Sequence, residues 1–154
     1  MGLSVSFSNR CGFIDGKNRA LIRTLLKHIS ETENKKIESL GYVFYSDDEL
    51  LELNISYLNH NTYTDIITFD LGNTKSEEII GEIYISRDRV KENANTYGVS
   101  FEDELIRVIS HGLLHLMGYK DKSTKDASIM REQEERCLSL WREISSVSRE
   151  TITF

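Results

Sequence analysis

The chain has 154 residues, 39% of them hydrophobic and 29% charged, and a formal net charge of −6 at pH 7. This suits one globular domain over residues 1–154 and excludes a disordered or collagen-like chain, while no apolar run approaches the roughly 20 residues of a membrane span. The acidic balance argues against coating nucleic acid through bulk positive charge, although a local basic site remains compatible with it.

The first half of the chain alternates strand-like and helical segments. Residues 4–7 alternate with the period of a strand, and residues 19–30 repeat apolar side chains at helical spacing. Residues 42–46 are aromatic and β-branched, which favours a strand, and the acidic start of residues 47–60 suits a helix N-terminus. The first helix also carries a line of cations at i, i+4 and i+8, namely Arg19, Arg23 and Lys27. Such a line is either a solvated face or a surface that meets phosphates.

The second half predicts two strands followed by three helices. Residues 65–71 and 79–86 read as strands, and the short polar segment between them favours antiparallel neighbours. Residues 87–98 predict a helix capped by Ser86 and ended by Gly98. The next helix, over 101–118, starts from a cap at Ser100, with Asp103 placed for a capping-box-like exchange. It has a core face of Leu105, Val108, Ile109, Leu113 and Leu116.

The last helix is expected over residues 125–145. Its predicted inner face consists largely of Ile129, Met130, Gln133, Cys137, Leu140, Trp141 and Ile144. This order of elements predicts an α+β or mixed α/β fold with four strands and four or five helices.

The N-terminus and the cysteines both favour a reducing, cytoplasmic compartment. The start MGLSVSFSNRCGF lacks the basic region and long apolar stretch of a secretory signal, so we expect a cytoplasmic protein. Cys11 and Cys137 lie far apart and form no CxxC pair, which predicts unpaired thiols in a reducing environment.

The run HGLLHLMGYKDKS, residues 111–123, has the spacing of a metal site. His111 and His115 are about one helical turn apart, so both imidazoles can face one ion. Gly118 suits a left-handed C-cap that turns the chain back, which would return the carboxylate of Asp121 to the same ion. Two nitrogens and one oxygen leave a position for water, as in catalytic sites. The alternative is that both histidines are surface residues or make core hydrogen bonds.

The spacing is also close to that of the metzincin proteases, whose metal helix reads HExxH. The glutamate of that motif activates the attacking water, but this chain has Gly112 at its position. Glu104 lies two turns before His111 and cannot replace it. A metallopeptidase is therefore the least favoured alternative.

The same run resembles the signature H-G-x-L-H-L-x-G-Y-D-H of the YbeY family of metal-dependent endoribonucleases. The residues that match it are His111, Gly112, Leu114, His115, Leu116, Gly118 and Tyr119. An upstream segment of the family is similar through Leu53, Asn54, Tyr57, Thr64, Asp65 and Phe69. The strand 81–86 and the segment 130–134 also have the family's pattern.

The resemblance implies an α+β fold with a small mixed sheet, one zinc or other divalent ion held by three residues, and single-stranded RNA as substrate. It also implies a role at the small ribosomal subunit, in maturing the 3′ end of its RNA and in ribosome quality control. Neither a membrane nor a dinucleotide cofactor is expected. On this reading His111, His115 and Asp121 are the catalytic metal ligands.

Two departures from the family pattern bear on activity. Asp121 stands where the family has its third histidine, and Lys120 where it has aspartate, which leaves the choice between zinc and a harder ion open. Leu58 replaces a family arginine expected near the RNA phosphate. The residues able to supply that charge instead are His60, Arg107, Lys120 and Lys122. A second hypothesis follows, namely a non-catalytic ribosome-assembly factor with a structural metal.

Overall fold

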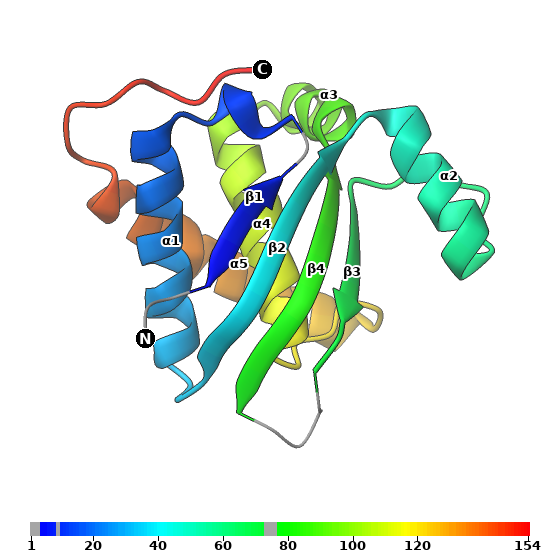
Figure 1. Cartoon of the computed structure of the whole chain (residues 1–154), viewed down its shortest axis with the longest axis horizontal. Coiled ribbons are helices and arrows are strands. Elements are labelled where there is room, and N and C mark those ends of the chain that lie inside the picture. The colour runs from blue at the N-terminus through cyan, green and yellow to red at the C-terminus, as the bar shows by residue number, and fades with distance from the viewer. Residues whose placement is uncertain (1–3, 9, 73–76) are drawn as a thin grey trace.

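The structure is a computed structural model that describes residues 4–8, 10–72 and 77–154. It contains a four-stranded sheet and five α-helices (Figure 1), which confirms the α+β fold with a mixed sheet. The strands are β1 (Val5–Ser8), β2 (Lys36–Tyr45), β3 (Ile66–Asp70) and β4 (Glu78–Ser86). The helices are α1 (Gly16–Glu31), α2 (Asp47–Leu58), α3 (Arg87–Tyr97), α4 (Phe101–Leu116) and α5 (Thr124–Ile144). A 3-10 turn, η1 (Cys11–Phe13), joins β1 to α1.

The sheet has the strand order β1-β2-β4-β3. The first three strands run parallel, whereas β3 pairs antiparallel with β4, with Ile67 opposite Tyr84. This confirms the expected antiparallel neighbours. It also places β3 at the edge of the sheet, where its far side is free to line a pocket.

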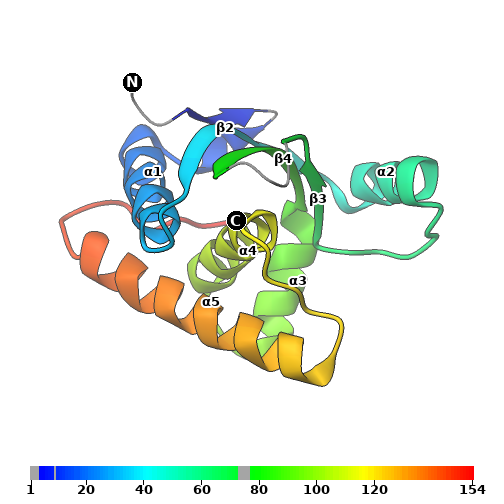
Figure 2. The same cartoon turned by 90° about the horizontal axis from the view of Figure 1, so that it is seen from below.

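The helices lie mainly on one side of the sheet. Figure 2 shows α1 and α4 beneath the strands, α5 beneath those two helices, and α2 standing beside β3. α4 contacts α5, α3, β3 and β4, so it is the central helix of the molecule. Among the described residues, no helix is both long and apolar enough to cross a membrane.

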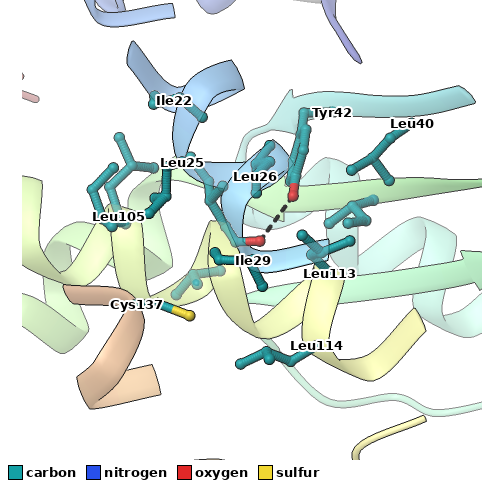
Figure 3. Close-up of a cluster of buried hydrophobic side chains, with 14 of the residues drawn as sticks. Ile22, Leu25, Leu26, Ile29, Leu40, Tyr42, Leu105, Leu113, Leu114 and Cys137 are labelled. Atoms are coloured by element: carbon teal, nitrogen blue, oxygen red, sulfur yellow. Dashed lines mark hydrogen bonds between the residues drawn. The ribbon is translucent and has the colours of Figure 1, made fainter. Parts of the chain in front are cut away.

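Buried side chains from α1, α4 and the sheet fill the space between these layers (Figure 3). At its centre the hydroxyl of Tyr42 donates a 2.8 Å hydrogen bond to the carbonyl of Ile109 on α4. Burial raises the pKa of Tyr42 well above its usual value. The expected core face of α4 is confirmed at Leu105, Val108, Ile109 and Leu113, while Leu116 is only partly buried.

The local signals at both ends of α3 and at the start of α4 are confirmed, whereas α4 ends at Leu116 with Met117 as its C-cap, before the predicted end at Gly118. The side chains of Ser86 and Ser100 cap α3 and α4, and Gly98 ends α3 at a φ of 69°. At Ser100 the hydroxyl accepts from the amide of Asp103, but the Asp103 carboxylate pairs with Arg142 on α5 instead of returning to the cap. Both cysteines are free thiols, as expected.

Three boundaries and faces differ from the expectation. α1 begins at Gly16 because Asp15 caps it, accepting from the amide of Asn18 at 2.8 Å. β2 begins at Lys36 because it pairs with β4 along its whole length. On α5, Ile129 is 38% exposed, so that part of the predicted inner face is wrong. The residues buried on α5 are Met130, Glu134, Cys137, Leu138 and Trp141.

Candidate metal centre

The second half of α4 and the segment after it form one wall of a pocket of about 550 Å³. His111, His115 and Asp121 all line this pocket. The histidines project from adjacent turns of α4, on the flank beside its core face, and Gly118 turns the chain at a φ of 106°. The spacing of the sequence motif therefore brings the three expected ligands to one cavity.

Both ring nitrogens of His111 face carboxylates. Its Nδ1 lies 2.7 Å from Oε2 of Glu134 on α5, and its Nε2 lies 3.3 Å from Oδ2 of Asp121. Burial disfavours the charged ring, but the hydrogen bond and charge of Glu134, together with Asp121 and Asp65, raise the pKa of His111. The ring is held between the two acids in a fixed orientation.

Asp65, Glu104 and Glu134 also line the pocket, beside Arg107. Burial raises the pKa of Asp65, although the neighbouring His111 opposes this shift. Burial also raises the pKa of Glu104, to about 7. Burial disfavours the charge of Arg107, but Glu134 and Glu104 outweigh that effect and raise its pKa. The described lining of the pocket therefore gathers several acids around the guanidinium of Arg107.

The described part of the chain holds no group of three or more His, Cys, Asp or Glu side chains arranged as a metal site. The side chains that line the pocket nevertheless include two imidazoles and a carboxylate, which are the groups that bind a divalent ion such as zinc. His111 bonds through Nδ1 to a buried carboxylate and turns Nε2 towards Asp121, as metal-ligating histidines commonly do. His115 lines the same pocket and adds a second imidazole.

The position after the first histidine faces the sheet and not the pocket. A Cβ on Gly112 would lie 2.6 Å from Cδ1 of Ile83 and 3.1 Å from Cδ1 of Ile66. A glutamate there would collide with the core and would not reach a metal-bound water. Gly112 therefore packs against the core, and this helix lacks the glutamate on which the metallopeptidase alternative depends.

The residues expected to contact RNA fall into two groups. His60 and Arg107 line the pocket, as does Lys122. The second group consists of Arg19, Arg23 and Lys27, which lie on α1 near the opposite edge of the sheet (Figure 1). None of these three residues lines the pocket.

The three cations on α1 have local partners. Arg19 donates to the carbonyl of Ile14, Arg23 donates to that of Val5 at 3.0 Å, and Lys27 pairs with Glu31 at 3.9 Å. Their contact with RNA stays a prediction.

Leu58, at the position of the family arginine, ends α2 and lines the pocket, 44% exposed. The pocket therefore has an apolar side chain where that arginine would place a positive charge.

The sequence patterns missed Glu134 as a member of this site. Glu134 lies on the same buried face of α5 as Met130, Cys137 and Leu138. An acidic residue on an otherwise apolar helix face is the sequence feature that could have indicated its role. The sequence suggests an RNA contact for Arg107 and no role in the site for Glu104, whereas in the structure Nε of Arg107 lies 3.3 Å from Oε1 of Glu104.

Comparison with known proteins gives concordant matches. The family model described as endoribonuclease YbeY matches residues 7–142. A protein from Cytophaga hutchinsonii named endoribonuclease YbeY is 51% identical over 124 residues, which cover 80% of this chain and 86% of that protein. A protein of the same name from Christiangramia forsetii is 44% identical, covering 77% and 82%. The solution structure of TM1509 from Thermotoga maritima is similar with a TM-score of 0.61 and 28% identity, covering 97% of both chains.

Proposed function

Because this chain belongs to the endoribonuclease YbeY family, we propose that it is a metal-dependent enzyme that cuts single-stranded RNA and matures the 3′ end of small-subunit ribosomal RNA. The observation that carries the proposal is the pocket that gathers His111, His115 and Asp121. The enzyme would act in the cytoplasm, with the small subunit or its assembly factors as partners, and would serve ribosome quality control.

The residues of the pocket have distinct tasks in this function. Two imidazoles and the carboxylate of Asp121 would hold one ion, zinc in the first instance, although a carboxylate ligand also suits harder ions. A bound metal of this kind polarises a phosphate oxygen or activates a water. Lys122 and His60 border the same cavity, where their donors would orient the RNA phosphate. α4 keeps the histidines in place because its opposite face is in the core.

The test is cleavage of a labelled single-stranded RNA by purified protein, preceded by metal analysis. We expect the wild-type protein to cut, while His115→Ala and chelator-treated protein do not, with activity returning when zinc is restored to the wild type. His28→Ala is the matched control, because His28 is an exposed histidine of α1 outside the pocket. Equal cleavage by all preparations would contradict the proposal.

A second function, that of a non-catalytic assembly factor, is favoured by one observation. Leu58 leaves the pocket without the charge of the family arginine. If the purified protein cuts no RNA while its depletion still disturbs ribosomal RNA processing, this second function replaces the first.

A further inference from the structure

A chain of three side chains links α4 to α5 behind the proposed metal ligands. Arg107 and His111 stand four residues apart on α4, so they project from adjacent turns of the same face. Glu134 of α5 reaches between them: its Oε1 lies 3.0 Å from Nη1 of Arg107 and its Oε2 lies 2.7 Å from Nδ1 of His111. Each carboxylate oxygen therefore has one partner, and the plane of the carboxylate is fixed.

The bond to His111 determines which ring nitrogen is available to a metal. Of the two carboxylate contacts of the ring, the one from Nδ1 to Glu134 is the shorter, at 2.7 Å against 3.3 Å, so we infer that the neutral ring donates from Nδ1. The lone pair then lies on Nε2, the nitrogen that points towards Asp121 at 3.3 Å. Glu134 is 6% exposed, so this bond is protected from water.

Arg107 is in turn paired with acidic side chains and is largely shielded from solvent. Its side chain is 16% exposed and lies within 3.3 Å of carboxylate oxygens of Glu104, Glu134 and Glu135. A guanidinium held in this way cannot swing into the pocket without leaving buried acids unpaired, which is costly. Its geometry suits holding Glu134 better than contacting RNA.

We propose that Glu134 is the positioning residue of the metal site, fixing the His111 ring so that Nε2 faces the ion, and that Arg107 orients the Glu134 carboxylate. This inference rests on the proposed function, since it takes His111 as a ligand. The competing explanation is that the Arg107–Glu134 pair merely joins two helices. In that case its loss would lower stability without changing which nitrogen of His111 carries the proton.

Zinc affinity of the metal-free protein, measured in competition with a chromophoric chelator, tests the proposal. We expect Glu134→Gln to weaken zinc binding about 10- to 100-fold, as the loss of an outer-shell partner does. Glu135→Gln is the matched control: it too loses a carboxylate next to Arg107, but at an exposed position, so zinc affinity should stay within about twofold of the wild type. Unchanged affinity in Glu134→Gln would overturn the proposal.

A second measurement determines directly which ring nitrogen of His111 carries the proton. Nitrogen-15 NMR of the metal-free wild-type protein, at alkaline pH where the ring is neutral, should show His111 with the proton on Nδ1, its resonance identified by its absence in His111→Asn. A proton on Nε2 would overturn the proposal. If the wild type takes up no zinc while the proton lies on Nδ1, the proposed metal function fails and the orientation of His111 by Glu134 is upheld.

Discussion

Glu104 is a buried acid whose charge is poorly compensated. Its side chain is 3% exposed, and its Oε1 lies 3.3 Å from Nε of Arg107 without the alignment of a hydrogen bond. Burial is the main reason that its pKa rises from 4.5 to about 7, and Asp65 and Glu134 add to the shift, against Arg107. The folded state therefore favours the protonated form of this residue.

The replacement Glu104→Gln should stabilise the protein in a pH-dependent way. Because the folded-state pKa is raised, the stability that Glu104 contributes is complete below pH 4.5 and is lost as the pH rises through about 7. Glutamine stays neutral, so above pH 7 the variant should gain on the order of 2–3 kcal/mol in free energy of unfolding, with little change at pH 4.5. Urea denaturation at both pH values measures the difference.

An exposed acid on α5 provides the control for this measurement. Glu143→Gln should change the free energy of unfolding equally little at both pH values, because Glu143 is exposed. A Glu104→Gln protein that is less stable than the wild type above pH 7 would show that the pairing with Arg107 outweighs burial.

Single residues show how far the sequence predicted the site. The spacing of His111, His115 and Asp121 is local, so it could be read directly from one helix and its turn. Glu134 could not be identified in this way, because its partner His111 lies on another helix. A pattern of apolar residues also gives no sign that an acidic residue on the same face is buried. Its position on a core stripe was visible, but the reason for it is a tertiary contact.

At the level of elements, a buried acid of α4 is one of the residues that hold the segment after α5 in place. Glu102 accepts hydrogen bonds from Trp141, from Arg149 at 2.7 and 2.8 Å, and from the amide of Ile152 at 2.9 Å. Burial alone would raise the pKa of Glu102, but these donors lower it. The charge is therefore fully paired, and it joins residues 146–154 to α4.

Removing the cation of this cluster should be strongly destabilising. Arg149→Met leaves Glu102 charged and buried without its main partner, which we expect to lower the free energy of unfolding by about 3–5 kcal/mol. The single tryptophan, Trp141, lies in the cluster and reports unfolding by fluorescence during urea denaturation.

A second arginine of the same region makes a matched comparison. Arg142 pairs with Asp103 at 3.4 Å, but its side chain is 57% exposed, so Arg142→Met should cost at most about 1 kcal/mol. Equal losses in the Arg149→Met and Arg142→Met variants would mean that the Glu102 cluster contributes no more than a surface ion pair.

Elements were predictable where their signals are local. Ser86, Ser100 and Gly98 mark helix ends through hydrogen bonds within a few residues, and the sequence identified all three. The first part of β2 was missed because pairing with β4, not its own composition, makes it a strand. The segment 146–154 carries no periodicity at all, and only its distant partners give it a defined path.

For the whole molecule, the class of fold followed from the alternation of strand and helix patterns, whereas the strand order did not. The sequence of β3 does not predict its place at the edge of the sheet. Only the short connection from β3 to β4 indicates that these two strands are neighbours. That position brings β3 opposite α4 and creates the pocket. The site is therefore a consequence of topology as well as of the histidine spacing.

Metal binding should stabilise the molecule as a whole. An ion held by α4 and the following segment binds only the folded chain, so zinc at about 100 times its dissociation constant should add about 2.7 kcal/mol to the free energy of unfolding. Denaturation of metal-free protein with and without zinc measures this gain, which His115→Ala should largely abolish. An equal gain in that variant would place the stabilising ion elsewhere.

The segment 146–154 also bears on how the chain is made. Asn18, buried on α1, donates through its side chain to the carbonyl of Glu150 at 2.6 Å, and Arg149 bonds back to it. Synthesis runs from the N-terminus, so Asn18 leaves the ribosome long before these partners exist. The hydrogen bonds of the buried Asn18 side chain are thus completed only after residues 149 and 150 have been made, so this contact between α1 and the segment after α5 forms late relative to the synthesis of α1.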